Sequence, residues 1–194
     1  MIKIGITGSI ASGKTTVSKI ISSGRGPLFV ADQVVKKLYK KNNFKRNVSK
    51  KLKFRMKYDF KNKIKEKILQ KKINLRKLEK IIHPLVRKEM LIFSKKNKTK
   101  KFLFFEIPLL IENKLSKYFD VIIFVRSNKQ IRLKRYVSKG GNVKIFSLLD
   151  NHQIKDTKKM KFCDFIVVNN KSLSVLKKKL LNIINLYERN FSRH

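Results

Sequence analysis

The chain has 194 residues, 42% of them hydrophobic, with three prolines and seven glycines, so we expect one compact domain with a sizeable core and no low-complexity linker. No apolar run approaches the ~20 residues of a membrane span, which excludes a membrane-spanning protein. The single cysteine, Cys163, excludes a disulfide within the chain. The amino terminus enters directly into an apolar strand, so we expect no signal peptide and a cytoplasmic location.

The net charge is +38, from 50 Lys and Arg residues against 12 Asp and Glu residues, and it raises the question of a nucleic-acid partner. Only ten of the basic residues are arginine, and the 40 lysines are spread along the whole chain. Lys, Asn, Ile and Phe are all abundant and can be encoded by codons of A and T alone, so an AT-rich genome explains the composition. We expect no specific nucleic-acid partner and no membrane partner; the alternative is a real but nonspecific affinity for polyanions.

The first element is an apolar strand over residues 2–7, followed by residues 8–15, which read G-S-I-A-S-G-K-T, and by a helical pattern over 16–21. This is a complete G-x-x-x-x-G-K-[ST] phosphate loop between a strand and a helix, the order that the motif requires. The alternative is a plain glycine turn between a strand and a helix.

The chemistry of this loop depends on its glycines, its lysine and its hydroxyl. Glycines let successive backbone N–H groups turn inward around phosphate oxygens, and the helix N-terminus adds donors and a partial positive charge. Lys14 is expected to reach the β and γ phosphates, and the Thr15 hydroxyl to ligate Mg²⁺. The nucleotide-binding candidates here are Gly8, Ala11, Ser12, Gly13, Lys14, Thr15 and Thr16.

The rest of the chain alternates apolar strands with helices. Helical spacing of apolar residues predicts mostly helix over 33–98, with a break at 59–62, and a last helix over 173–187. Further strands are expected at 27–31, 101–107, 120–125 and 164–169. Continuous apolar strands separated by helices indicate an α/β fold with a parallel sheet covered on both faces.

Ligands of such sheets bind outside the carboxyl ends of the strands. That rim brings together the phosphate loop, Asp32, Glu106, Arg126 and Asn169, which predicts a nucleotide site. Within a single domain over residues 1–194 we expect a helical acceptor subdomain and a basic lid that carries Arg126, Arg132 and Arg135 ahead of a glycine pair. The boundaries are 1–32, 99–125 and 161–194 for the nucleotide-binding core, 33–98 for the acceptor subdomain and 126–160 for the lid.

At this point the chain resembles the dephospho-coenzyme A kinase family over nearly its whole length. Residues 4–15 resemble that family's phosphate loop, and Val30-Ala31-Asp32 falls where the family has Asp-Ala-Asp. Residues 78–87 resemble its L-E-x-x-x-H-P-x-[VI]-R block, and residues 108–112 match its P-L-L-x-E. The two later blocks make the resemblance specific, because the phosphate loop alone identifies only a superfamily.

The resemblance implies a three-layer P-loop fold with five parallel strands in the order 2-3-1-4-5. It implies transfer of the ATP γ-phosphate to the ribose 3′-hydroxyl of dephospho-coenzyme A, with ATP and Mg²⁺ as cofactors. The implied catalytic residues are Lys14, Asp32 and Arg132, with Asp32 as general base and, beside Thr15, as a metal ligand. Further nucleotide contacts are implied for Arg135 and Asn169, and acceptor contacts for Asp32, Lys61, His83, Arg87, Pro108, Leu109 and Glu112.

Six of these side chains also have a plainer interpretation. Asp32 is also a preferred helix N-cap, and His83 before a proline also fits a packed residue that stops one helix and starts the next. Glu112 also fits a capping or pairing residue, and Asn169 also fits a residue in the turn at the end of a strand. Arg132 and Arg135 also fit solvated helix charges.

Some positions depart from the family's pattern. Val30 replaces an Asp, Glu106 stands where an Asp is usual, and Leu149 stands where an Arg is usual. Lys61 replaces an arginine of the acceptor domain, which keeps the charge but loses the bidentate fork. The spacing of Arg135 also differs, and the sequence does not decide whether Asp32 or Glu106 is the base.

Two other functions remain open from the sequence. One is another P-loop kinase, acting on a nucleoside or a nucleoside monophosphate. The other is a basic RNA-binding protein with a vestigial nucleotide site. We expect a monomer or a weak homo-oligomer with dephospho-coenzyme A as its small-molecule partner.

Overall fold

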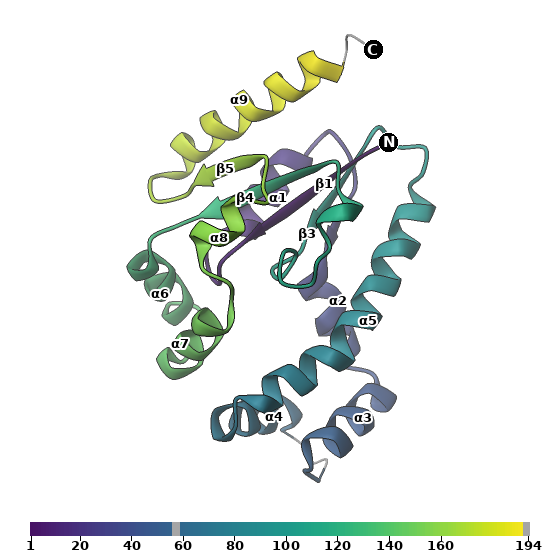
Figure 1. Ribbon diagram of the computed structural model, residues 1–194, viewed down its shortest axis with the longest axis vertical. Coiled ribbons are helices and arrows are strands. Elements are labelled where there is room, and N and C mark those ends of the chain that lie inside the picture. Colours follow the sequence, from purple (N-terminus) through teal and green to yellow (C-terminus); the bar gives the residue numbers. More distant parts are fainter. Residues whose placement is uncertain (56–58, 192–194) are drawn as a thin grey trace. The chain divides into compact units, whose positions relative to one another are not determined.

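The computed structural model describes residues 1–55 and 59–191, and side chains up to residue 185. Helices and strands alternate along the chain (Figure 1). Their order is β1 (Ile2–Gly8), α1 (Lys14–Ser22), β2 (Leu28–Val30), α2 (Ala31–Leu38), α3 (Asn42–Leu52), α4 (Phe60–Gln70), α5 (Ile73–Lys96), β3 (Phe102–Glu106), the 3-10 helix η1 (Ser116–Tyr118), β4 (Val121–Arg126), α6 (Lys129–Val137), α7 (Val143–His152), α8 (Asp156–Met160), β5 (Phe165–Val168) and α9 (Leu173–Phe191).

The five strands form one sheet in the order β2-β3-β1-β4-β5. The pairs β1–β3, β1–β4 and β4–β5 are parallel, with Ile4 opposite Phe104 and Ile6 opposite Ile123. All five strands lie where the apolar runs predict them, and the strand order implied by the resemblance is confirmed. The central strands read as continuous apolar runs because both of their faces are buried.

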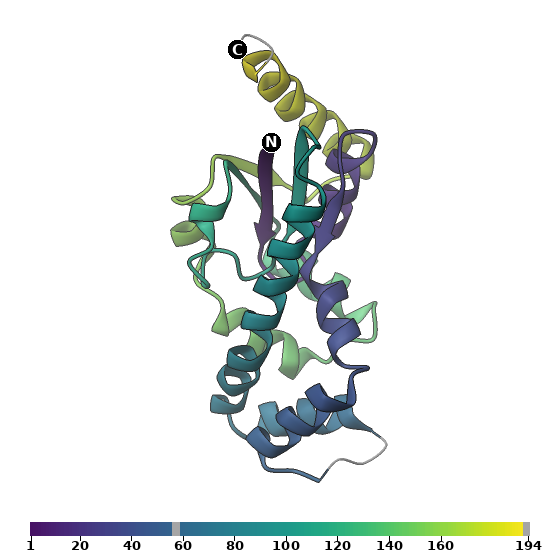
Figure 2. The same cartoon turned by 90° about the vertical axis from the view of Figure 1, so that its right-hand side faces the viewer.

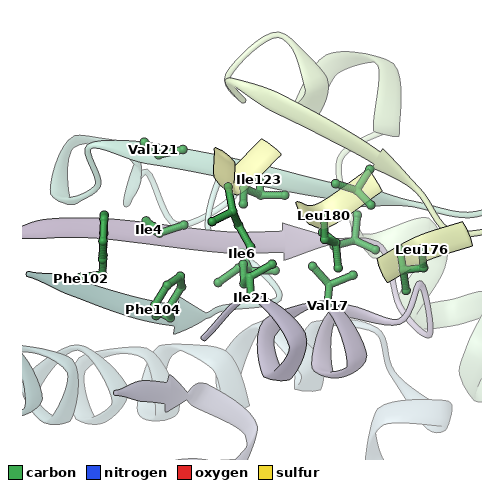
Figure 3. Close-up of a cluster of buried hydrophobic side chains, with 13 residues drawn as sticks. Ile4, Ile6, Val17, Ile21, Phe102, Phe104, Val121, Ile123, Leu176 and Leu180 are labelled. Carbon is green, nitrogen blue, oxygen red and sulfur yellow. The ribbon is translucent and has the colours of Figure 1, made fainter. Parts of the chain in front are cut away.

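One face of the sheet carries the main hydrophobic core (Figure 3). Ile6 of β1 and Ile123 of β4 pack there against Val17 and Ile21 of α1 and against Leu180 of α9. The apolar residues of α1 and α9 recur at helical spacing, so each helix turns one stripe to the sheet. This packing fixes the start of α1, and therefore the phosphate loop, at the carboxyl end of β1.

The segment after β3 covers part of the other face. A Cβ atom at Gly5 would lie 2.7 Å from Leu110 Cδ1, so the central strand needs glycine at this close approach. The rings of Phe105 and Phe119 meet edge to face, with centroids 5.3 Å apart. The loop between β3 and β4 is therefore packed onto the sheet and holds the residues that follow Glu106.

The described chain divides into two compact units. The core unit comprises Met1–Phe29 and Asn97–His194, and the helical unit comprises Val30–Lys96. Within the helical unit, the long helix α5 packs against α2, α3 and α4 (Figure 2). Phe44 and Val48 of α3 and Leu75 of α5 are buried there.

One local expectation for the helical unit is wrong, and one of the plainer interpretations does not hold. The break expected at 59–62 ends at Asp59, whose carboxylate accepts from the Asn62 N–H and so caps α4, with Phe60 already helical. Helix α5 does not stop at His83, because it continues through Pro84 to Lys96. A proline removes only one helical N–H, and buried residues on both sides of it, Leu78 and Met90, hold the helix in place.

The glycine pair lies in the turn between α6 and α7. Gly140 has φ 76°, and the Asn142 side chain caps α7 by accepting from the N–H groups of Lys144 and Ile145.

Within the described ranges, no helix combines the length and the apolar character needed to cross a membrane.

Candidate active site

The phosphate loop runs from the end of β1 at Gly8 to the start of α1 at Lys14. Gly13 has φ 98° and Ala11 has φ 57°, so the loop turns twice through the left-handed region. A Cβ atom at Gly8 would lie 2.3 Å from the Val125 carbonyl oxygen, and one at Gly13 would lie 2.1 Å from Asn169 Nδ2. Both motif glycines are therefore required by close approaches as well as by backbone conformation.

The start of α1 is arranged to receive an anion. Its N-cap residue, Gly13, offers no side-chain cap, and its first turn contains no acidic residue. The N–H groups of a first helical turn have no partner within their helix, and the helix dipole adds partial positive charge there. Nothing in the side chains of this turn competes with a phosphate for these donors.

Lys14 curls back over the loop. Its Nζ donates to the carbonyl oxygens of Gly8, at 3.0 Å, and Ser9, at 2.9 Å, and the side chain is buried. The ammonium group is therefore held against the first half of the loop by two backbone carbonyls.

The Thr15 hydroxyl meets a buried carboxylate. It donates to Glu106 Oε1 at 2.6 Å, and the Ser18 hydroxyl donates to Glu106 Oε2 at 2.9 Å. Glu106 ends β3 and is 2% exposed. Within the described residues no cluster of three or more His, Cys, Asp or Glu side chains could hold a metal. A hydroxyl beside one carboxylate instead fits Mg²⁺ as it binds beside substrate phosphates.

Asn169 and Arg135 both contact the loop at Ser12. Asn169 Nδ2 donates to the Ser12 carbonyl oxygen at 2.9 Å, and Arg135 Nη1 donates to the same oxygen at 3.4 Å. Arg135 Nη2 also donates to the Asn169 carbonyl oxygen at 3.1 Å. The end of β5 and helix α6 thus hold the second half of the loop, and neither side chain is a freely solvated charge or a simple strand-end turn.

Arg132 is buried against the first half of the loop. Its Nη1 donates to the Ile10 carbonyl oxygen at 3.3 Å and forms an ion pair of 2.5 Å with Asp150. Its Nε donates to the Ser127 carbonyl oxygen, and its guanidinium lies 5.7 Å from the centre of the Phe146 ring. A solvated helix charge does not describe this residue, which is 6% exposed.

The segment after β3 holds the predicted acceptor contacts of the core unit. The Pro108 carbonyl oxygen accepts from the Thr7 hydroxyl at 3.1 Å, and the Leu109 carbonyl oxygen accepts from Asn113. Glu112 Oε1 lies 2.6 Å from Lys159 Nζ and accepts from the Ile154 N–H. An acceptor contact for these residues stays a prediction, and Glu112 has the pairing partner that its plainer interpretation expects.

The remaining predicted residues belong to the helical unit. Asp32 is exposed in the first turn of α2, whose N-cap is Val30, so Asp32 is not the N-cap of that helix. Lys61 is exposed on α4, and His83 and Arg87 stand one turn apart on α5. The helical unit also contains a hollow lined by Leu38, Lys41, Asn42, Asn43, Phe44, Asn47 and Leu85.

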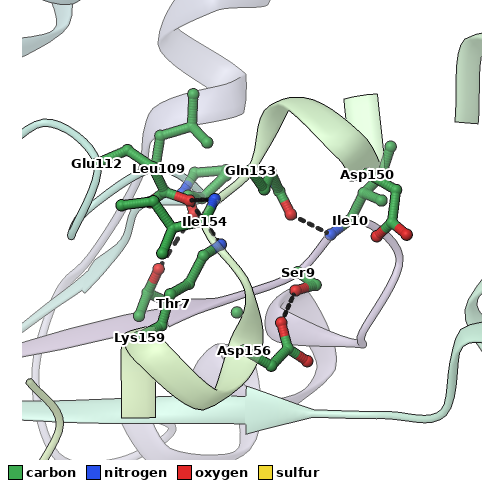
Figure 4. A network of polar contacts seen from close by, with 12 residues as sticks. Thr7, Ser9, Ile10, Leu109, Glu112, Asp150, Gln153, Ile154, Asp156 and Lys159 are labelled. Atoms are coloured by element: carbon green, nitrogen blue, oxygen red, sulfur yellow. Dashed lines mark hydrogen bonds and ion pairs between the residues drawn. The ribbon is translucent and has the colours of Figure 1, made fainter. Parts of the chain in front are cut away.

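Several residues of the site were not among the predicted ones. Ser18 is one helical turn beyond Lys14, and only the knowledge that Glu106 faces α1 would have identified it. Gln153 and Asp156 bind Ile10 and Ser9 from the link between α7 and α8, and Lys159 pairs with Glu112 (Figure 4). In a chain with 40 lysines, no sequence signal separates Lys159 from the solvated ones.

The chain is similar to known proteins in sequence and in fold. The family model described as dephospho-CoA kinase matches residues 2–174. A dephospho-CoA kinase of Rickettsia typhi is 32% identical over 97% of this chain and 98% of its own length. One of Zymomonas mobilis is 34% identical over 91% of each chain.

Solved structures share the fold. A dephospho-CoA kinase from Campylobacter jejuni has a TM-score of 0.66 at 24% identity and covers 97% of this chain and 98% of its own. A shikimate kinase from Acinetobacter baumannii has a TM-score of 0.53 at 15% identity and covers 98% of this chain and 94% of its own. A family model that matches nearly the whole length, relatives above 30% identity and an intact phosphate loop agree: the chain belongs to the dephospho-CoA kinase family.

Proposed function

We propose that this chain transfers the γ-phosphate of ATP to the ribose 3′-hydroxyl of dephospho-coenzyme A, giving coenzyme A and ADP in the last step of coenzyme A synthesis. The observation that carries the proposal is the phosphate loop, with Lys14 and Thr15 in place, in a chain that matches the dephospho-CoA kinase family from residue 2 to residue 174. Kinases of this family use ATP.

The core unit is proposed to bind the nucleotide. The N–H groups of the loop and of the first turn of α1 would surround the phosphates, and Lys14 would exchange the carbonyl oxygens of Gly8 and Ser9 for phosphate oxygens. This exchange keeps the buried ammonium partnered in both states. Arg135 and Asn169 are proposed to border the nucleotide, and their support is the shared contact with Ser12.

Mg²⁺ is proposed to bind beside the Thr15 hydroxyl. Two oxygen ligands of the kind that Mg²⁺ prefers, Thr15 Oγ1 and Glu106 Oε1, lie 2.6 Å apart, so the residues fit the ion. When bound, the ion neutralises charge on the phosphate oxygens. Asp32 is retained as a second proposed ligand on the resemblance alone.

The helical unit is proposed to bind the acceptor. Its hollow combines amide side chains, Lys41 and an apolar floor, which suits a ligand with amide and phosphate groups on a flexible chain. Lys61, His83 and Arg87 are the proposed polar contacts of this unit. The oxygen of the 3′-hydroxyl would bond to the γ-phosphorus while Asp32 accepts the hydroxyl proton. The bond between the γ-phosphorus and the oxygen of the β-phosphate would break at the same time, which releases ADP.

Three further parts of the proposal rest on the sequence. Residues 126–160 would act as a lid over the phosphates, with Arg132 beside the transferred group. The protein would be a monomer or a weak homo-oligomer in the cytoplasm. No specific nucleic-acid partner is proposed, because the positive charge is dispersed over lysines.

An acceptor panel tests the function. The purified protein, ATP and Mg²⁺ are incubated with dephospho-coenzyme A, adenosine monophosphate, uridine monophosphate or shikimate, and products are identified by mass. We expect phosphate transfer to dephospho-coenzyme A alone. Transfer to a nucleoside monophosphate without formation of coenzyme A would assign the chain to another P-loop kinase activity.

A further inference from the structure

Basic side chains are rarely buried in this chain. Among residues 1–55 and 59–185, only Lys14, Arg132 and Lys159 are buried basic residues, with 7%, 6% and 0% of their surface exposed. Lys14 belongs to the phosphate loop, and Arg132 donates to the Ile10 carbonyl oxygen of the loop. Lys159 has no role in the proposed function. Burying a cation costs several kcal/mol unless a partner compensates it, so its position needs an explanation.

The partner of Lys159 is Glu112. Lys159 Nζ lies 2.6 Å from Glu112 Oε1, and the same oxygen accepts from the Ile154 N–H at 3.3 Å. Glu112 belongs to the packed segment after β3, whereas Ile154 belongs to the link between α7 and α8. The Glu112 carboxylate therefore joins the packed segment after β3 both to the link, through Ile154, and to helix α8, through Lys159.

The same link holds the phosphate loop. Gln153 Oε1 accepts from the Ile10 N–H at 3.1 Å, and Asp156 Oδ1 accepts from the Ser9 hydroxyl. These two contacts lie on either side of Ile154 in the sequence. Figure 4 shows Glu112 and Lys159 pointing toward each other, with Gln153 and Asp156 pointing toward the loop.

The position of Ser9 sets the rest of the loop. Its carbonyl oxygen accepts from Lys14 Nζ at 2.9 Å and from the Ser12 N–H at 3.2 Å. A displacement of Ser9 would thus move the lysine and the turn that present donors to a phosphate. The contacts form a continuous chain from Lys159 through the link to Lys14.

We propose that Lys159 is a positioning residue for nucleotide binding, which acts through Glu112, Gln153 and Asp156 on the phosphate loop and does not touch the nucleotide. The proposal rests on the proposed function only in that it takes this loop as the site of the ATP phosphates. It predicts that loss of the lysine weakens nucleotide binding and leaves acceptor binding unchanged.

The test compares Lys159→Met with Lys158→Met, because Lys158 is an exposed neighbour on the same helix. Dissociation constants for ADP and for dephospho-coenzyme A are measured by calorimetry on the full chain, and the melting temperature is recorded. For Lys159→Met we expect the ADP constant to rise about tenfold, the scale of one lost hydrogen bond, and the acceptor constant to stay within about twofold. Lys158→Met should match the wild type in both.

Two further variants keep the proposal testable if Lys159→Met unfolds. Lys159→Met with Glu112→Leu removes both charges, so no unpaired charge stays buried, and it should still bind ADP more weakly. Gln153→Ala should weaken ADP binding, and adding Lys159→Met should weaken it less than additively, because both changes act through one link.

Three results would overturn the proposal: a melting temperature that falls while ADP affinity stays unchanged, an equal loss of affinity for both ligands, or full additivity with Gln153→Ala. If the wild-type protein phosphorylates no acceptor while Lys159→Met still shows the expected loss of ADP affinity, the result would count against the proposed function and leave the role of Lys159 supported. A wild-type protein that binds no ADP would overturn both.

Discussion

The Thr15 hydroxyl donates a hydrogen bond of 2.6 Å to Glu106 Oε1, which joins the end of the phosphate loop to the end of β3. The Ser18 hydroxyl occupies the other oxygen of the same carboxylate at 2.9 Å. Both oxygens of Glu106 are therefore held by hydroxyl groups of α1. The sequence leaves open whether Asp32 or Glu106 is the base, and the contact with Thr15 supports our proposal that Glu106 binds Mg²⁺.

Replacement of Glu106 by glutamine tests this assignment. Glu106→Gln keeps the shape of the side chain but removes its charge, and a neutral amide is a poorer Mg²⁺ ligand than a carboxylate, so the Mg²⁺ concentration for half-maximal activity should rise about tenfold or more. Activity is measured across a magnesium titration. Ser18→Ala, which removes one hydrogen bond from the same carboxylate, is the control and should shift the titration much less. An unchanged magnesium requirement in Glu106→Gln would contradict the assignment.

Replacement of Asp32 by asparagine tests the proposed base. Asparagine cannot take the proton of the 3′-hydroxyl, so turnover should fall by about 100-fold while the affinity for dephospho-coenzyme A changes little. Steady-state kinetics and separate binding measurements check both parts. Glu66→Gln, another exposed carboxylate of the helical unit, should leave turnover unchanged. Near-normal turnover in Asp32→Asn would show that Asp32 serves only the start of α2.

The left-handed glycine at the start of α1 gives a prediction about stability. Gly13→Ala places a Cβ atom 2.1 Å from Asn169 Nδ2, at φ 98°, and so displaces the amide that bonds to Ser12. We expect a loss of unfolding free energy of about 2 kcal/mol or more in urea titrations, from backbone strain and the lost hydrogen bond. Gly140→Ala has a similar φ of 76° but open space around it, and should cost about 1 kcal/mol. Equal losses of unfolding free energy in Gly13→Ala and Gly140→Ala would contradict the close approach of Asn169 to Gly13.

The cysteine gives a prediction about pH. Burial, followed by the nearby Asp164 carboxylate, raises the pKa of the Cys163 thiol from its ordinary value of 9.0 to about 11. A raised pKa means less thiolate, which is the reactive form, so at pH 8 alkylation in the folded protein should be about 100-fold slower than in urea. The rate should climb as the pH approaches 11. Alkylation of the folded protein at pH 8 as fast as in urea would contradict the raised pKa of the Cys163 thiol.

The sequence predicts most of the fold because its strongest signals are local. The runs 102–105 and 121–125 are apolar throughout because the strands are buried on both faces. The helical spacing of apolar residues predicts helix through Pro84, but the plainer interpretation of His83 as a helix stop stayed open, because a proline usually ends a helix and the packing on both sides of it is not visible in the sequence. The strand order came from the resemblance and not from the residue pattern.

The sequence likewise predicts one part of the site and not the other. The motif identifies Lys14 and Thr15, because the chemistry of phosphate binding fixes their spacing. The support behind the loop comes from contacts between residues far apart in the sequence, such as Asp156 with Ser9 and Lys159 with Glu112. Burial alone distinguishes Lys159 from the other lysines, and burial is a property of the fold.

The most direct test of the central claim is the fate of the γ-phosphate. ATP that carries an isotopic label in that group is incubated with Mg²⁺, dephospho-coenzyme A and the protein, and the product is analysed by mass before and after treatment with a 3′-nucleotidase. We predict labelled coenzyme A that the nucleotidase returns to dephospho-coenzyme A. Lys14→Ala should lower the rate about 100-fold or more, the scale of losing a preorganised donor, and the exposed control Lys19→Ala should not. Label released only as free phosphate, or found on another position of the acceptor, would contradict the account.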